Sequence, residues 1–207
     1  MSTHPAIDTI MRTSPVIPVL VIEDAAHAQP IARALVGGGL RVLEVTLRTP
    51  AALDVIREMS KVEGAIVGAG TVLNEADLRE SIDAGARFIV SPGLTEPLGK
   101  AAIASGIPFL PGTANAGDIM RGLDMGLTRF KFFPAEASGG LKALKALAAP
   151  FDNVRFCPTG GITQATAPDW LAEAAVLCVG GSWLVGKGTP DGGAIEAAAR
   201  AASAIKA

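Results

Sequence analysis

The chain has 207 residues, of which 49% are hydrophobic and 18% charged. This length supports one hydrophobic core, so we expect a single domain over residues 1–207. Mean hydropathy is +0.40, yet no window approaches the roughly 18 uninterrupted apolar residues that a membrane-spanning helix needs. The net charge is −2, and without basic runs a nucleic-acid partner is not expected.

The segment Met1–Met11 has no apolar stretch, so we expect no secretory signal and a cytoplasmic protein. The two cysteines, Cys157 and Cys178, are too few for a disulfide framework or, alone, for a zinc site. His4 and His27 fall in the N-terminal segment and in a predicted helix, away from strand ends. We therefore expect no bound metal and two reduced thiols that fill the core.

Short β-branched and aromatic runs alternate with alanine- and leucine-rich stretches of helical spacing along the whole chain. In chain order these runs cover residues 16–22, 42–47, 65–69, 88–90, 108–110, 130–133, 154–157 and 176–179. The alternation predicts an α/β fold with parallel strands, as a single (β/α)8 TIM barrel. A doubly wound open sheet is the alternative, but no glycine fingerprint follows the first run.

Capping residues mark where several of the intervening helices begin and end. Thr49 followed by Pro50 is typical of an N-cap and a first helical position. Asn74 precedes a first turn rich in acidic residues, which predicts a second N-cap. Gly85, Gly106 and Gly126 each stand before a predicted strand and are expected to end the preceding helices.

The sixth run holds Lys131 between Phe130 and Phe132. If both phenylalanines face the outer helices, strand alternation turns Lys131 inward. A desolvated amine near another cation is a nucleophile toward carbonyl groups. The alternative is a surface lysine whose stem lies along apolar surface. The other lysines fall in predicted helices or loops, so Lys131 is the candidate nucleophile.

The second run carries Glu44 among aliphatic residues, where an unpartnered carboxylate is costly. Alternation puts one polar face toward the interior and one apolar face toward the helices. The polar face consists of Val42, Glu44, Thr46 and Arg48, and the apolar face of Leu43, Val45 and Leu47. Glu44 is either a general base beside an anion-binding Arg48, or the partner of Arg48 or Lys131 in a structural ion pair.

Glycine-rich segments follow three of the runs. Gly160–Gly161 and Gly180–Gly181 come after the last two runs, where glycines let backbone amides approach a phosphate closely. The third run ends at Gly68-Ala69-Gly70-Thr71, and Leu73 stands where a dinucleotide fingerprint needs its third glycine. This segment is therefore expected to form a tight turn that presents the Thr71 hydroxyl.

Together these segments resemble the 2-keto-3-deoxy-6-phosphogluconate aldolase family, class I aldolases of the Entner–Doudoroff pathway. The likeness runs from Pro15 to about Val185. The segments that carry it are 41–49 (RVLEVTLRT), 68–72 (GAGTV), 91–93 (SPG), 131–136 (KFFPAE), 158–162 (PTGGI) and 180–183 (GGSW).

The resemblance implies a homotrimer without metal or cofactor. Its expected reaction cleaves 2-keto-3-deoxy-6-phosphogluconate to pyruvate and D-glyceraldehyde 3-phosphate, with a side activity on 4-hydroxy-2-oxoglutarate. By resemblance, Lys131 forms the Schiff base, Glu44 is the acid/base, and Arg48 and Thr71 hold the pyruvate carboxylate. The same resemblance implies that the phosphate is held by Thr159, Gly160, Gly161, Gly181 and Ser182. Some relatives place an arginine after the first strand, where this chain has Val21-Ile22-Glu23.

Two other functions stay open on the residues alone. A phosphosugar isomerase or epimerase on the same barrel would use the glycine segments without forming an imine. A non-catalytic sensor would bind a phosphorylated ligand without turnover. Borohydride trapping with pyruvate separates the first alternative from an aldolase, and a pyruvate-release assay separates the second.

Overall fold

The computed structural model describes residues 4–186 and 188–205. Its strands are β1 (Val16–Leu20), β2 (Val42–Thr46), β3 (Ile66–Gly70), β4 (Ile89–Val90), β5 (Phe109–Leu110), β6 (Gly112–Thr113), β7 (Arg129–Phe132), β8 (Arg155–Pro158) and β9 (Val179–Gly181). Its helices are α1 (His4–Met11), η1 (Ala25–His27, 3₁₀), α2 (Ala28–Gly37), α3 (Ala52–Met59), α4 (Glu75–Asp83), α5 (Glu96–Ser105), α6 (Ala116–Asp124), α7 (Gly140–Ala148), α8 (Ala167–Leu171) and α9 (Gly192–Ser203). Each of the eight predicted runs overlaps one of these strands.

The prediction of a closed eight-stranded barrel is wrong. The strands pair in parallel as a six-stranded sheet, in the order β5-β4-β3-β2-β1-β9, and as a three-stranded sheet, β6-β7-β8. The fifth predicted run, residues 108–110, corresponds to β5, and after Pro111 the chain enters β6, which belongs to the other sheet and was not predicted. No ladder joins β8 to β9 in the described residues, and two isolated bridges next to these strands, Phe156 to Val176 and Thr159 to Gly180, link their segments. Proline has no N–H to donate to a ladder, and Pro111 and Pro158 stand at these two seams.

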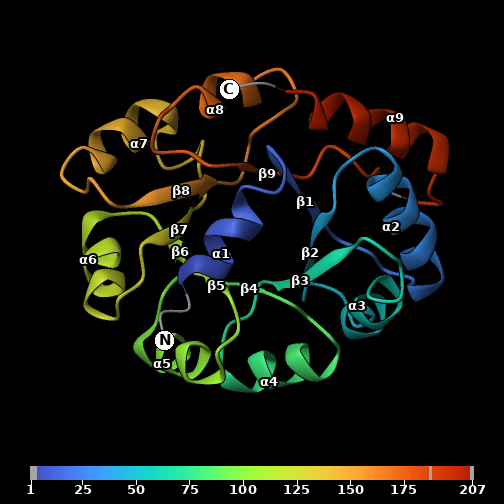
Figure 1. Ribbon diagram of the computed structural model, residues 1–207, viewed down its shortest axis with the longest axis horizontal. Coiled ribbons are helices and arrows are strands. Elements are labelled where there is room, and N and C mark those ends of the chain that lie inside the picture. The colour runs from blue at the N-terminus through green and yellow to red at the C-terminus, as the bar shows by residue number, and fades with distance from the viewer. Residues whose placement is uncertain (1–3, 187, 206–207) are drawn as a thin grey trace.

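The period-two patterns predicted for β2 and β7 are confirmed. Leu43, Val45, Phe130 and Phe132 belong to the main core, between the strands and the surrounding helices. Val42 belongs instead to a second cluster in the interior, which both sheets line. Figure 1 shows α2 to α9 arranged around the strands in chain order. The helices within the described residues are too short or too polar to cross a membrane.

The N-terminal segment forms an element that the sequence analysis did not predict. Helix α1 lies over the centre of the strands in Figure 1. Its buried side chains Ile7, Ile10 and Met11 pack in the interior cluster with residues of both sheets, among them Val90 and Cys157. Because these three residues follow the i, i+3, i+4 spacing of one helix face, α1 covers one end of the interior with its apolar side.

Of the two predicted N-caps, one is confirmed and the other is wrong. The Asn74 N-cap is confirmed, since its side chain accepts a hydrogen bond from the Asp77 N–H. The Thr49 N-cap is wrong, because α3 begins only at Ala52. The Thr49 hydroxyl donates instead to the Ile22 carbonyl, at 2.7 Å, and so ties the loop after β2 to the loop after β1.

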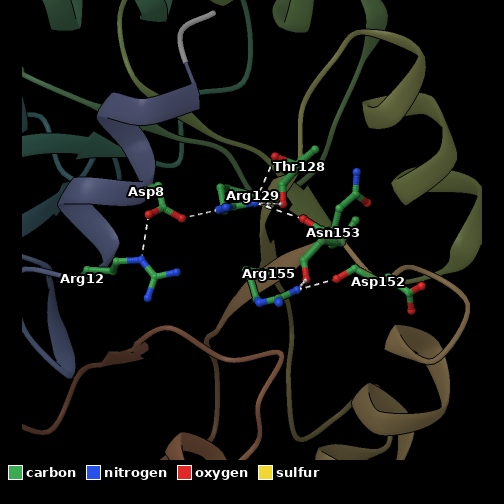
Figure 2. A network of polar contacts seen from close by, with 8 residues as sticks. Asp8, Arg12, Thr128, Arg129, Asp152, Asn153 and Arg155 are labelled. Carbon is green, nitrogen blue, oxygen red and sulfur yellow. Dashed lines mark hydrogen bonds and ion pairs between the residues drawn. The ribbon is translucent and has the colours of Figure 1, made fainter.

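An ion-pair network fixes α1 to the start of β7 (Figure 2). One carboxylate oxygen of Asp8 accepts from Arg129 Nε at 2.6 Å, and the other accepts from Arg12 Nε at 2.7 Å. Arg129 also donates to Thr128 and to the Asn153 carbonyl. Burial raises the pKa of Asp8, but the hydrogen bonds from Arg12 and Arg129 outweigh it and hold that pKa below its ordinary value.

The Asp8→Asn variant is expected to lose a contribution to stability that depends on pH. A carboxyl whose pKa is lowered by folding stabilises the fold fully above its unfolded-state pKa, and this contribution is lost as pH falls through the native pKa. The free energy of unfolding in urea should therefore differ between wild type and Asp8→Asn near pH 7, and the difference should shrink by about pH 3. The control is Asp54→Asn in an exposed pair with Arg57. A difference for Asp8→Asn that does not change with pH would contradict this account.

Candidate functional site

Lys131 and Glu44 form a buried ion pair between the two sheets. Lys131 projects from β7 and Glu44 from β2, and Lys131 Nζ lies 3.0 Å from Glu44 Oε1. Both residues are almost excluded from solvent, with exposed fractions of 6% and 3%. Of the partners that the sequence left open for Glu44, the structure therefore places Lys131 beside it. An amine and a carboxylate at this distance can exchange a proton directly.

Lys131 also lies near an aromatic ring at the end of its strand. Its Nζ is 5.4 Å from the ring centroid of Phe133, which is half-buried. A cation over an aromatic face is stabilised by the ring quadrupole. Phe133 thus borders the amine on one side and Glu44 borders it on another. Sequence reasoning did not identify Phe133 as a site residue, although it is two residues from Lys131 on the same face of the run.

Gly70 makes room for the Glu44 carboxylate. Strands β2 and β3 pair in register, with Thr46 opposite Gly70. A Cβ atom at Gly70 would overlap Glu44 Oε1 and would lie 2.7 Å from Glu44 Cγ. Sequence reasoning placed Gly70 in a tight turn and missed this close approach, because nothing local in the sequence indicates it.

The Gly70→Ala variant is therefore expected to displace Glu44 and to lower turnover more than stability. A methyl group at this position cannot be accommodated unless the Glu44 side chain shifts from the position that places its carboxylate beside Lys131. Because general acid–base catalysis requires hydrogen-bond geometry, we expect a loss of about 10²-fold or more in kcat. The matched control is Gly93→Ala, where an added Cβ meets no atom within 4 Å. Wild-type kcat for Gly70→Ala would contradict this role of Gly70.

Thr71 follows Gly70 in a conformation that threonine rarely adopts. Its φ is +61°, and it is the one non-glycine residue with positive φ in the described part of the chain. A β-branched residue in the left-handed region carries backbone strain, which persists where the surroundings impose it and is common at functional sites. The sequence predicted a tight turn over residues 68–71, whereas Gly68 to Gly70 belong to β3 and the chain bends only at Thr71, at the carboxyl end of the strand.

Arg48 and Ser182 line the same cavity, which has a volume of about 690 Å³. Its described lining runs from Val19 to Asp24 and includes His27 and the chain after β9. Lys131 and Glu44 are not among the described residues that line it. The resemblance assigned Arg48 and Ser182 to opposite ends of a substrate, whereas the structure brings both to one cavity. Val21, Ile22 and Glu23, the segment that follows β1, line this cavity too.

The two glycine segments lie side by side. An isolated bridge joins Thr159 to Gly180, and a Cβ atom at Gly180 would overlap the Thr159 hydroxyl. Gly160 and Gly161 have φ values of +105° and +81°, so this turn needs glycine at both positions. A Cβ atom at Gly181 would overlap the Trp183 ring. The structure thus brings together the predicted phosphate-binding residues of the two loops.

The two cysteines lie in the interior cluster and belong to no metal-binding group. Both are buried free thiols. A hydrogen bond with Cys157 and burial raise the pKa of the Cys178 thiol well above its ordinary value. In residues 4–186 and 188–205, no three His, Cys, Asp or Glu side chains are grouped so that they could hold a metal ion.

Comparison with known proteins identifies the family of the chain. The model of the KDPG and KHG aldolases matches residues 7–198. The chain belongs to this aldolase family. The 2-dehydro-3-deoxy-phosphogluconate aldolase of Zymomonas mobilis is 62% identical over 97% of this chain and 96% of its own length. The KHG/KDPG aldolase of Escherichia coli K12 is 59% identical over 86% of this chain and 84% of its own.

Solved structures of the family share this fold. A crystal structure of the Zymomonas mobilis ZM4 aldolase with 3-phosphoglycerate has a TM-score of 0.95 and 62% identity, and covers 97% of this chain and 96% of that one. The KDPG aldolase of Legionella pneumophila has a TM-score of 0.92 and 42% identity, and covers 96% of this chain and 98% of its own. That structure holds pyruvate captured at low pH as a covalent carbinolamine intermediate.

Proposed function

We propose that this aldolase cleaves 2-keto-3-deoxy-6-phosphogluconate to pyruvate and D-glyceraldehyde 3-phosphate through a Schiff base on Lys131. The observation that carries the proposal is the buried amine of Lys131, 3.0 Å from the Glu44 carboxylate. Breaking a carbon–carbon bond β to a ketone requires an electron sink, and a protonated imine provides one. The carbinolamine held by the Legionella pneumophila relative supports the same route here.

The reaction can be written with Glu44 as the group that moves protons. The Lys131 amine attacks C2 of the substrate, and proton transfer through Glu44 lets the C2 oxygen leave as water. The Glu44 carboxylate then takes the proton of the C4 hydroxyl while the C3–C4 bond breaks. The electron pair of that bond flows into the iminium and leaves an enamine, and the aldehyde departs. Protonation of the enamine at C3 and hydrolysis of the imine release pyruvate and restore Lys131.

The remaining residues are proposed to hold the two charged ends of the substrate. Arg48 and the strained Thr71 would bind the pyruvate carboxylate. The backbone of Gly160, Gly161 and Gly181, with the Thr159 and Ser182 hydroxyls, would bind the phosphate. Positive φ values at Gly160 and Gly161 support this role, because they orient consecutive peptide groups as phosphate turns require. The 3-phosphoglycerate held by the Zymomonas mobilis relative supports a site for a phosphate-bearing ligand.

Three finer properties are proposed from the family alone. The E. coli relative is named for both substrates, so we propose a side activity on 4-hydroxy-2-oxoglutarate. We also propose a cytoplasmic homotrimer, which would have three times the 21.0 kDa mass of the chain. Light scattering during gel filtration measures that mass directly, and a monomer would refute the trimer.

Borohydride trapping tests the central step. Reduction in the presence of pyruvate should convert the imine into a stable secondary amine, and peptide mapping should place the added mass on Lys131. A coupled assay should detect pyruvate released from 2-keto-3-deoxy-6-phosphogluconate. Pyruvate release without any trapped adduct would refute the Schiff base, and an adduct on another lysine would refute the assignment of Lys131.

A further inference from the structure

We propose that Glu136 is a positioning residue that aims the Gly160–Gly161 turn at the substrate phosphate through its hydrogen bond with Trp170. The proposal rests on the proposed function, because it assumes that this turn binds phosphate. Glu136 lies in the segment between β7 and α7 and carries no role in the catalytic steps above. Its contacts reach the phosphate turn, helix α8 and, through α8, the strand that carries Lys131.

The backbone of Glu136 sets the direction of one peptide group in the turn. Its N–H donates to the Gly160 carbonyl at 3.1 Å, and the neighbouring Ala135 N–H donates to the Thr159 carbonyl at 2.8 Å. Carbonyl and N–H point to opposite sides of a trans peptide. The Gly161 N–H therefore points away from Glu136, and within the described residues no backbone carbonyl accepts it. A substrate phosphate on that side would supply the missing acceptor.

The side chain of Glu136 packs against the same turn. A Cβ atom at Gly161 would lie only 2.7 Å from both Cβ and Cγ of Glu136. The stem of Glu136 thus packs directly against the Gly161 backbone and limits how far the turn can tilt. Gly161 has a φ of +81°, so the turn depends on this particular backbone conformation.

The carboxylate of Glu136 connects the Gly160–Gly161 turn to the buried side chain of Trp170. Its Oε1 accepts from the indole Nε1 of Trp170 at 3.2 Å. Trp170 is 2% exposed on α8, and its ring lies 6.4 Å from that of Phe132, the neighbour of Lys131 on β7. One side chain therefore connects the phosphate turn to the strand of the nucleophile. This connection would fix the distance between the phosphate and the reacting carbon.

The negative charge of Glu136 indicates that this residue acts by positioning the Gly160–Gly161 turn and not by attracting the phosphate. A carboxylate beside a phosphate turn repels the phosphate, so attraction cannot be the reason for its presence. Glutamine has the same shape and an oxygen that can accept from Trp170, but it has no charge. Glu136→Gln should therefore bind the phosphorylated substrate as well as wild type or better. Glu136→Ala, which loses the stem beyond Cβ and the acceptor, should bind it worse.

The experiment measures KM and kcat for 2-keto-3-deoxy-6-phosphogluconate and the rate of borohydride trapping with pyruvate. For Glu136→Ala we expect KM to rise about tenfold, as for the loss of a hydrogen bond to a charged group, with kcat changed less than about threefold. Trapping with pyruvate, which carries no phosphate, should match wild type. Glu136→Gln should restore the wild-type KM, and Trp170→Phe should raise KM in the same direction as Glu136→Ala.

Three results would overturn the proposal. These are an unchanged KM for Glu136→Ala, an equal loss in cleavage and in pyruvate trapping, and a KM for Glu136→Gln as high as that of Glu136→Ala. Thermal unfolding of each variant separates loss of fold from loss of positioning, and a folded Glu136→Gln keeps the test decisive if Glu136→Ala is unstable. Failure of the proposed function would look different, because wild type itself would then show neither trapping nor pyruvate release.

Discussion

Replacing Lys131 with arginine is expected to abolish cleavage and leave the fold intact. Arginine keeps a positive charge for Glu44, so the buried carboxylate does not lose its partner. A guanidinium stays protonated in proteins and cannot form the imine. Loss of a covalent nucleophile should lower kcat by at least about 10⁴-fold. Pyruvate release and borohydride labelling measure the two losses separately, and thermal unfolding reports on the fold.

The matched control is Lys145→Arg. Lys145 lies on α7 and pairs with Glu173 at 3.3 Å on the surface. This variant makes the same chemical change away from the interior, so it should keep wild-type turnover and labelling. Cleavage by Lys131→Arg at a rate near that of wild type would remove Lys131 from the mechanism. The Lys131–Glu44 pair would then have a structural role only.

The sequence was enough to predict which side chains face the interior, because that information is local. Glu44 and Lys131 each stand between apolar neighbours on a short strand, and period-two alternation assigns their direction. The flanking residues Leu43 and Phe130 belong to the main core, as the alternation requires. Local sequence is therefore sufficient to identify the buried carboxylate and amine as candidates, although it does not show their contact.

The pairing between strands that are distant in the sequence could not be predicted from local alternation. The sequence predicted eight similar runs, but it did not show that a further strand, β6, forms after Pro111 and belongs to a different sheet from the fifth run. The hydrogen bond from Thr49 to the Ile22 carbonyl likewise joins two loops that are 27 residues apart. This bond occupies the Thr49 hydroxyl, which the local sequence pattern predicted to be an N-cap. The contact between Gly70 and Glu44 was missed for the same reason, since it depends on the register of β2 and β3.

Helix α1 was missed although its signal was present. Ile7, Ile10 and Met11 have the spacing of one helix face, although the segment has no continuous apolar stretch. The three buried side chains are enough to close one end of the interior cluster. Periodicity, rather than total hydropathy, is the property that identifies a short helix of this kind.

Glu44→Gln is expected to slow cleavage by roughly 10²–10⁴-fold, the usual contribution of a general acid–base group. The amide can still accept a hydrogen bond from Lys131, so the geometry of the site should change little. Substrate KM should stay close to the wild-type value, because Glu44 acts on protons in transit rather than on the charged ends of the substrate. Steady-state kinetics with 2-keto-3-deoxy-6-phosphogluconate separates kcat from KM.

Proton exchange at the methyl group of pyruvate provides a second measurement for the same variant. An imine on Lys131 can form an enamine only if a base removes a proton from C3, and Glu44 is the buried carboxylate beside the amine. Exchange into deuterated solvent should therefore fall together with kcat. The control is Glu58→Gln on α3, whose carboxylate pairs with Lys61 at the surface. Unchanged cleavage and exchange in a destabilised Glu44→Gln protein would make Glu44 a structural partner of Lys131, and the proton carrier would have to be another group.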